Sequence, residues 1–344
     1  MMGSVEPIGR GRAGGTRAAP DGIAAVEERT RAGLVRVERA LARAVTSTDP
    51  FIREAAGFLL AAGGKRFRPT CVLLAGHFGD PDEPKLVDAS VAIELTHLST
   101  LYHDDVMDDA ELRRGTRTAN ARYGNHVAIL TGDYLFALAS EITADLGTEA
   151  TRVLARAIGR LCQGQIRDVR GPLDDEDPTG HYTRVLEDKT GALIAAACRL
   201  GALLSGAEGG VVEALTEYGE RVGVAFQLGD DLLDITGGTS GGGTSGKEPG
   251  TDLRQGVRTL PVLYLLRQGG AAAEPVRRVL DGTTDDASVE AALDALRGSE
   301  AFAAARASAR AEVDRARACL AALPAGGARE ALDLLAGRAL ERDS

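Results

Sequence analysis

The sequence predicts an all-α protein, and three observations support this fold class. From Ile23 onward nearly every segment has the apolar spacing of an amphipathic helix, and Ala, Leu, Glu and Arg dominate these segments. The chain lacks a convincing run of alternating β-branched residues, which would mark a strand. Clusters of Gly and Pro separate the helical segments, yet no composition shift marks a linker. We therefore expect a single helical domain over residues 23–344.

The order of the elements follows from the breakers. Residues 1–22 are rich in Gly, Arg and Pro, so we expect a disordered N-terminal tail. Loops are predicted at 79–84, 171–180 and 237–250, and the helices between breakers are often about 20 residues, roughly 30 Å, long. The most apolar stretch, 191–206, is dominated by Ala and Gly. It is typical of a tightly packed core helix rather than a membrane span.

Composition excludes several classes of function. The 344 residues are 44% hydrophobic and 26% charged, which is ordinary for a soluble globular protein. The net charge of −10 argues against a general nucleic-acid binder. The four cysteines form no CxxC pair, and the N-terminus has no apolar signal segment. We expect a cytoplasmic protein with no nucleic-acid partner and at most peripheral membrane contact.

Two acidic sets carry most of the chemical information. Asp104-Asp105-Val106-Met107-Asp108 and Asp230-Asp231-Leu232-Leu233-Asp234 both follow the pattern DDxxD, and more than a hundred residues separate them. In a helix the first and last Asp of each set share one face, where like charges cost about 0.2–0.5 kcal/mol per pair. A bound cation would offset that repulsion, and oxygen ligands suit Mg²⁺. The alternative is a solvated acidic turn with surface salt bridges.

Basic residues near these sets predict an anion between them. Arg113-Arg114 follows the first set, and guanidinium groups bind phosphate bidentately. The segment Gly63-Gly64-Lys65-Arg66-Phe67-Arg68 is either a diphosphate site or a solvated helix start. Residues 241–247 read GxxxxGK, but Glu248 stands where a phosphate-binding loop needs Ser or Thr. We expect a flexible lid there that brings Lys247 to a phosphate.

Taken together, these motifs resemble the trans-isoprenyl diphosphate synthases, or polyprenyl synthetase family, over roughly residues 25–340. The matching motifs are GGKRFRP at 63–69, HDDVMDDAELRRG at 103–115, GNHVAILTGDYL at 124–135, GQ at 164–165, DKTGAL at 188–193, FQLGDDLLD at 226–234 and GKEPGTDLRQGVRTLP at 246–261. Three departures keep their charge: Asp168 and Asp109 stand where Glu is common, and Arg258 where Lys is common.

The resemblance implies a role for each matching residue. The implied magnesium ligands are Asp104, Asp108, Asp230 and Asp234, with Asp105 and Asp231 supporting them. The residues implied to bind the diphosphate of isopentenyl diphosphate are Lys65, Arg68, His97 and Arg114. Those implied to hold the allylic diphosphate are Arg113, Lys189, Lys247 and Arg258, with Thr190 and Gln227 near the developing cation. We count Asp104, Asp105, Asp108, Asp230, Asp231 and Lys189 as catalytic, and we interpret Gly132-Asp133 as structural.

The resemblance also implies a fold, a reaction and an assembly. The expected fold is a bundle of long antiparallel helices around a central cavity, and the family is typically a homodimer. The expected reaction is a magnesium-dependent condensation of isopentenyl diphosphate onto an allylic diphosphate. A class I terpene cyclase is less favoured, since the chain has 4% aromatic residues and no Trp. A non-catalytic synthase subunit is also less favoured, because both acidic sets are intact.

Product length is predicted from the residues that precede the first acidic set. In the family, the growing chain enters a tunnel that runs from this set, and a bulky residue one turn earlier shortens the product. Thr96, Ser99 and Thr100 occupy these positions, and all three are small. We therefore expect a heptaprenyl to decaprenyl product, with a menaquinone side chain as its destination. The alternative is a geranylgeranyl or farnesyl product, with a large residue on a neighbouring helix closing the tunnel.

Overall fold

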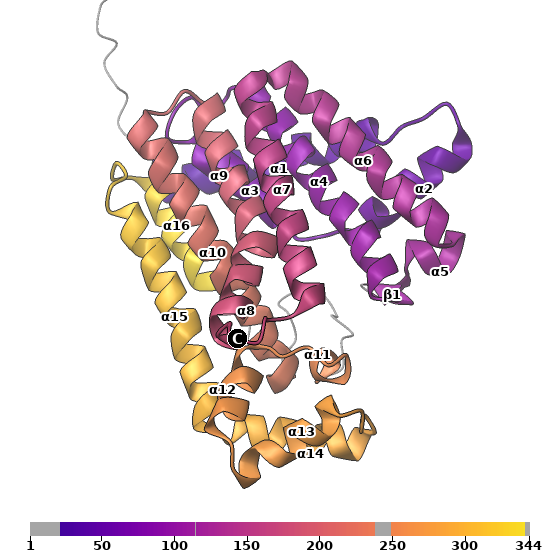
Figure 1. Ribbon diagram of the computed structural model, residues 1–344. Helices are drawn as coiled ribbons and strands as arrows, with labels where there is room; N and C mark the ends of the chain where they lie inside the picture. The colour runs from indigo at the N-terminus through magenta and orange to yellow at the C-terminus, as the bar shows by residue number, and fades with distance from the viewer. Residues whose placement is uncertain (1–20, 114, 238–248, 341–344) are drawn as a thin grey trace, which may run out of the picture.

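The computed structural model describes residues 21–113, 115–237 and 249–340, and these residues form an α-helical bundle (Figure 1). The only strands in the described ranges are the two-residue β1 and β2, which pair antiparallel with Arg113 opposite Thr116. The all-α prediction is therefore confirmed, with one small ribbon that the sequence did not predict. The elements are α1 (Ile23–Ala44), α2 (Pro50–Ala61), α3 (Phe67–Gly76), α4 (Lys85–Met107), β1 (Leu112–Arg113), β2 (Thr116–Arg117), α5 (Ala119–Tyr123), α6 (Asn125–Leu146), α7 (Thr148–Arg170), α8 (Pro178–Leu186), the π-helical turn η1 (Glu187–Gly191), α9 (Ala192–Leu204), α10 (Gly209–Thr236), α11 (Thr251–Arg254), α12 (Leu260–Gln268), the 3₁₀ turn η2 (Ala271–Ala273), α13 (Glu274–Leu280), α14 (Asp286–Arg297), α15 (Glu300–Leu320) and α16 (Gly327–Arg338).

Several helix starts follow directly from the sequence. Asp49 and Asp177 each precede a proline and accept a backbone N–H from the first turn, at 2.8 Å from Phe51 N and 2.8 Å from Gly180 N. Side-chain caps of this kind satisfy N–H groups that the helix itself leaves unpaired. Because α8 begins at Pro178, the predicted loop at 171–180 ends a few residues earlier than expected.

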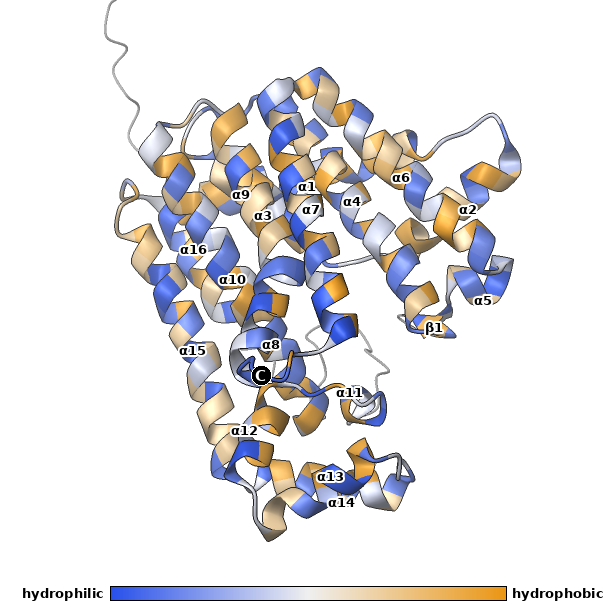
Figure 2. Ribbon diagram, in the orientation of Figure 1, coloured by the Kyte–Doolittle hydropathy of each residue, from blue (hydrophilic) through white to orange (hydrophobic). Residues whose placement is uncertain are grey.

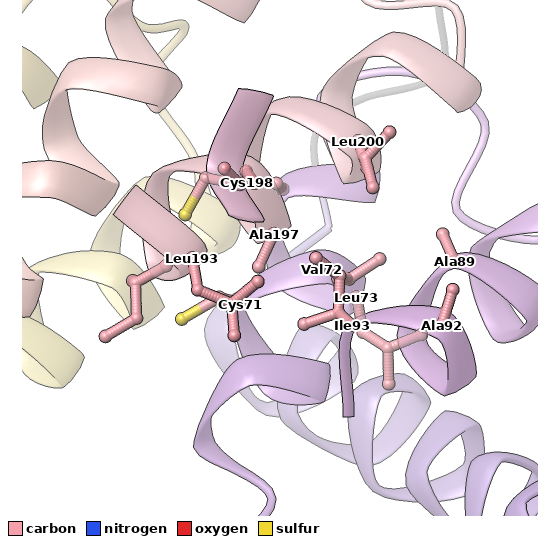
Figure 3. Close-up of a cluster of buried hydrophobic side chains, with 14 of the residues drawn as sticks. Cys71, Val72, Leu73, Ala89, Ala92, Ile93, Leu193, Ala197, Cys198 and Leu200 are labelled. Atoms are coloured by element: carbon pink, nitrogen blue, oxygen red, sulfur yellow. The ribbon is translucent and has the colours of Figure 1, made fainter. Parts of the chain in front are cut away.

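The main hydrophobic core lies where α3, α4, α9 and α10 meet. Figure 3 shows Cys71 and Val72 of α3 packed with Ile93 of α4 and with Leu193 and Cys198 of α9, and all five are buried. Close packing needs Gly201 on α9, because a Cβ there would lie 2.1 Å from the carbonyl oxygen of Val72. The stretch 191–206, predicted as a core helix, contains the buried helix α9, and its backbone packs closely against that of α3.

A second, smaller core is formed by buried residues between 235 and 301. The helices α12, α13 and α14 pack around buried residues such as Val262 and Leu293, and Figure 1 shows them below the main bundle. The helices α4 and α10 both end on this lower side, where β1, α8 and α11 also lie (Figure 1). Since the two acidic sets occupy the last turns of α4 and α10, the fold brings both to the same side of the molecule.

Candidate active site

The first acidic set lies at the C-terminal end of α4. Asp104 and Asp105 belong to its last turn, and Asp108 caps the helix. Asp105 is fully buried and accepts a hydrogen bond of 2.6 Å from Arg113 Nε on β1. The short ribbon thus turns the chain back so that a predicted substrate-binding arginine contacts a predicted catalytic aspartate. The second arginine of this motif, Arg114, lies outside the described residues.

Asp104 is half-buried, and its electrostatic surroundings are informative. Burial raises the pKa of Asp104, and the negative charges of Asp108 and Asp105 raise it further. The positive charges of Lys189 and Arg113 act in the opposite direction and lower the pKa. A partly buried carboxylate with two acidic neighbours is stabilised by added positive charge, which is the environment that the sequence predicted.

The turn before Asp104 is held by α6. His103 Nε2 lies 3.2 Å from the carbonyl oxygen of Ile129 and 3.3 Å from Asp133 Oδ1. A Cβ on Gly132 would lie 2.4 Å from the same Nε2, so only glycine allows this approach. Gly132 and Asp133 therefore contact the residue that precedes the first acidic set, and their structural role stays a prediction.

Lys189 is positioned by a π-helical turn between α8 and α9. Its Nζ lies 2.6 Å from Asp168 Oδ2 on α7. The neighbouring Asp188 accepts hydrogen bonds from Arg160 Nε at 2.8 Å and from Arg167, both also on α7. Single π turns are frequent at functional sites. Here the turn is bound to α7 through Asp188 and through Lys189 itself, and the charge of Lys189 acts on Asp104 of α4.

The second acidic set lies in the last turns of α10 and begins a chain of polar contacts. Buried Asp231 accepts a hydrogen bond of 3.2 Å from Gln227 Nε2 and another from the hydroxyl of Tyr182 on α8. Thr190 Oγ1 donates to Gln227 Oε1 at 3.2 Å. The structure therefore connects Thr190 and Gln227, both implied to lie near the developing cation, with Asp231. Asp230 is half-buried.

Asp234 has a contact that the sequence did not predict. Its carboxylate accepts the backbone N–H groups of Thr251 and Asp252 at 3.2 and 3.1 Å, at the start of α11. Its carbonyl oxygen accepts the N–H of Gly250 at 2.7 Å. This aspartate therefore anchors the N-terminal end of α11 to the C-terminal end of α10. Lys247 and the greater part of that segment lie outside the described residues.

The basic segment 63–68 divides into buried and accessible cations. Arg66 is buried, has φ of 49°, and its Nη1 lies 3.0 Å from Glu94 Oε1. Lys65 is exposed and Arg68 half-buried. The ring of Phe67 lies 4.9 Å from that of Phe226, centroid to centroid, so the start of α3 packs one turn before Asp230. This contact joins the start of α3 to the turn of α10 that precedes the second acidic set.

The remaining predicted residues lie on α4 and on the segment between α11 and α12. His97 is half-buried on α4, and Arg258 is exposed between α11 and α12. Thr96 and Ser99 are buried, whereas Thr100 is half-buried and donates a hydrogen bond to the carbonyl oxygen of His97. The sequence analysis missed Tyr182 because a single tyrosine four positions into a short helix carries no signal until its partner on α10 is known.

The geometry defines a class of protein: an α-helical bundle with two carboxylate sets at neighbouring helix ends and lysine and arginine side chains beside them. The model of the polyprenyl synthetase family matches residues 49–296. The nonaprenyl diphosphate synthase of Mycobacterium tuberculosis is 45% identical over 314 residues, 91% of this chain and 93% of that protein. Heptaprenyl diphosphate synthase component 2 of Geobacillus stearothermophilus is 42% identical over 88% of this chain and 93% of that protein.

A solved structure is similar over nearly the whole fold. The polyprenyl synthase of Caulobacter crescentus, complexed with calcium and isoprenyl diphosphate, superposes with a TM-score of 0.86 at 34% identity. The match covers 95% of this chain and 100% of the other. The chain belongs to the polyprenyl synthetase family, and it is a prenyltransferase.

Proposed function

We propose that the protein is an all-trans polyprenyl diphosphate synthase that adds isopentenyl diphosphate head-to-tail to an allylic diphosphate and makes a long product. The observation that carries the proposal is the convergence of Asp104, Arg113 and Lys189 at the end of α4, beside the end of α10. Two relatives with long-chain names, nonaprenyl and heptaprenyl, support the length. The small side chains of Thr96, Ser99 and Thr100 support it independently.

The carboxylate sets fit a hard divalent cation, and we propose Mg²⁺. Within the described ranges, no three His, Cys, Asp or Glu side chains are arranged to hold an ion by themselves. Mg²⁺ often binds through one or two carboxylates and completes its sphere with water and substrate phosphates. The calcium in the Caulobacter crescentus complex supports a divalent ion. We assign its direct ligands to Asp104, Asp108 and Asp230, with Asp234 contributing if its contact with α11 opens.

The residues of this chain bind and orient two diphosphates. When bound, the metal would neutralise the charge of the departing diphosphate and so assist cleavage of the allylic C–O bond. Lys189 and Arg113 add positive charge on the same side. Lys65, Arg68 and His97 would hold isopentenyl diphosphate so that its double bond meets the allylic cation. The new C–C bond forms, and the released diphosphate takes the proton lost from the adjacent carbon.

Incubation with farnesyl diphosphate, isopentenyl diphosphate and Mg²⁺, followed by chain-length analysis, tests the proposal. We expect products of seven to ten isoprene units. Absence of elongation would refute the synthase, and a product that stops at geranylgeranyl would favour the short-chain alternative. Menaquinone is the proposed destination in the cell, and loss of its side chain from cells that lack the protein is the matching test.

We further propose a cytoplasmic homodimer formed through α6 and α7. Leu130 on α6 is 66% exposed and Val169 on α7 is 76% exposed, and Figure 2 shows hydrophobic residues on both helices. By length and composition α6 alone among the described helices could cross a membrane, and 33% of its apolar window is buried. A second copy would cover this surface.

The oligomeric state in solution tests the dimer. Leu130→Asp should produce monomers in sedimentation velocity, whereas Val35→Asp, on the exposed side of α1, should leave the wild-type assembly. If the wild type is monomeric and binds vesicles, the exposed apolar surface of α6 and α7 would instead be a membrane-contact surface. The Geobacillus stearothermophilus relative is named as one component of a synthase. The third outcome is therefore that this chain pairs with a different subunit.

A further inference from the structure

A cavity of about 490 Å³ lies on the side of α10 that faces α15 and the end of α16. Leu232 of α10, Phe302 and Val313 of α15, and Leu340 give it an apolar wall. Its volume is within the range of about 300–1,000 Å³ that is typical of small-molecule sites. None of the residues that line it belongs to the substrate-binding set described above.

Among the charged side chains that line the cavity, arginines outnumber acids. Arg306 and Arg310 lie one turn apart on α15, both are exposed, and neither forms a hydrogen bond or ion pair with another described residue. Arg317 also lines the cavity but pairs with Asp333 at 3.0 Å. With Asp314 the only acid in the lining, arginines are in excess. Two adjacent guanidinium groups repel each other and are well suited to bind a phosphate between them.

The position of the cavity links it to the active site through one helix. Gly229, Leu232 and Thr236 face the cavity and share one side of α10. Asp231 and Asp234 belong to the same turns but contact Tyr182 on α8 and the start of α11. A ligand that packs against Leu232 therefore acts on the helical turn that carries the second acidic set.

We propose that this cavity is a second, regulatory site for an anionic prenyl amphiphile, with its phosphate groups on Arg306 and Arg310 and its hydrocarbon chain against Leu232, Phe302 and Leu340. The inference rests on the proposed function, because that function supplies ligands of this chemistry. Occupancy would alter the second acidic set from the opposite side of α10. Accumulated prenyl diphosphate would then inhibit the enzyme without competing at the active site.

Binding of farnesyl thiolodiphosphate, an analogue with a C–S bond in place of the reactive C–O bond, tests the site by calorimetry in the presence of Mg²⁺. We expect two equivalents per chain in the wild type. In Arg306→Gln/Arg310→Gln the second equivalent should bind at least ~10-fold more weakly, since two charge-assisted contacts are lost. The matched control is Arg39→Gln/Arg43→Gln, which removes two exposed arginines at the same spacing on α1 and should bind like the wild type.

The outcomes are distinct. If the Arg306/Arg310 variant still binds two equivalents, the site is refuted. If inorganic pyrophosphate binds the second site as tightly as the prenyl analogue, the apolar wall has no role and the amphiphile is refuted. Initial rates at low farnesyl diphosphate should be equal in all three proteins. Inhibition at high concentration should disappear only in the Arg306/Arg310 variant. If none of the proteins elongates a substrate, the proposed function fails, and calorimetry still decides whether the cavity binds.

Discussion

Lys189 Nζ lies 2.6 Å from Asp168 Oδ2, although 21 positions separate these residues in the sequence. The pair joins the π-helical turn to α7 and holds the ammonium group where its charge lowers the pKa of Asp104. The side chains of Lys189 and Asp168 are 31% and 45% exposed, so the pair contributes little to stability. The pair instead orients Lys189, which the sequence predicts to bind the allylic diphosphate.

Asp168→Asn should lower activity without unfolding the protein. Without its partner, Lys189 would sample other rotamers, and we expect kcat/KM for the allylic substrate to fall roughly 10-fold. The melting temperature should change little, because an exposed ion pair contributes under about 1 kcal/mol. Asp168→Glu keeps the charge and should retain activity. Wild-type kinetics in Asp168→Asn would show that the pair does not position Lys189.

Asp104→Ala should abolish condensation and leave the fold intact. Burial and the charges of Asp108 and Asp105 disfavour the ionised carboxylate, so its removal should not lower the melting temperature. We expect turnover to fall by at least about 100-fold. Asp174→Ala, in the exposed loop after α7, is the control and should be fully active. Retained activity in Asp104→Ala would refute the metal assignment.

Thr100→Phe should shorten the product. Thr100 is only half-buried and lies one turn before Asp104, so it can accept a large ring that projects into the path of the growing chain. Chain-length analysis should show a shift toward geranylgeranyl, and Thr100→Val, which keeps the size, should not change the product. Thr96 and Ser99 are buried, so Phe at either position should instead overpack the core and cost about 1–3 kcal/mol of stability.

Tyr182→Phe should raise the magnesium requirement. The hydroxyl of Tyr182 donates to Asp231, and such outer contacts typically change metal affinity or activity by about 10- to 100-fold. We expect a higher half-saturating Mg²⁺ concentration and a smaller change in kcat at saturating metal. Tyr264→Phe removes a hydroxyl that contacts Ser308 at 3.1 Å and serves as the control. If the half-saturating Mg²⁺ concentration of Tyr182→Phe equals that of the wild type, the hydroxyl of Tyr182 has no role in metal binding.

Stability should decrease as the pH falls below neutral, and His77 should account for part of this slope. Burial lowers the pKa of His77, and the positive charge of Arg29 lowers it further. The unfolded chain therefore takes up the proton first, near pH 6.5, which favours unfolding at lower pH. His77→Gln should flatten the dependence of melting temperature on pH between about 5.5 and 7.5. His126→Gln, which removes an exposed imidazole, should keep the wild-type slope.

The sequence by itself determined the helical class, the two acidic sets and their family. These features depend on local information: apolar spacing predicts helices, and a motif such as DDxxD is read within a single turn. The helical spacing assumed for the first set holds up to Met107, where α4 ends. The stretch 191–206 is the core helix it was expected to be. The roles assigned to individual site residues stay predictions until the variants above are measured.

The tertiary structure decided which charges meet. Three cations crowd the segment 65–68, and only packing shows that Arg66 is buried with Glu94 while Lys65 remains exposed. The sequence does not distinguish Asp234 from the other aspartates of its set, yet in the structure its carboxylate binds the start of α11. A contact between residues far apart in the chain depends on how whole helices pack. The local spacing of apolar residues does not determine that packing. For the same reason, the arginine-lined cavity behind α10 is visible only in the fold.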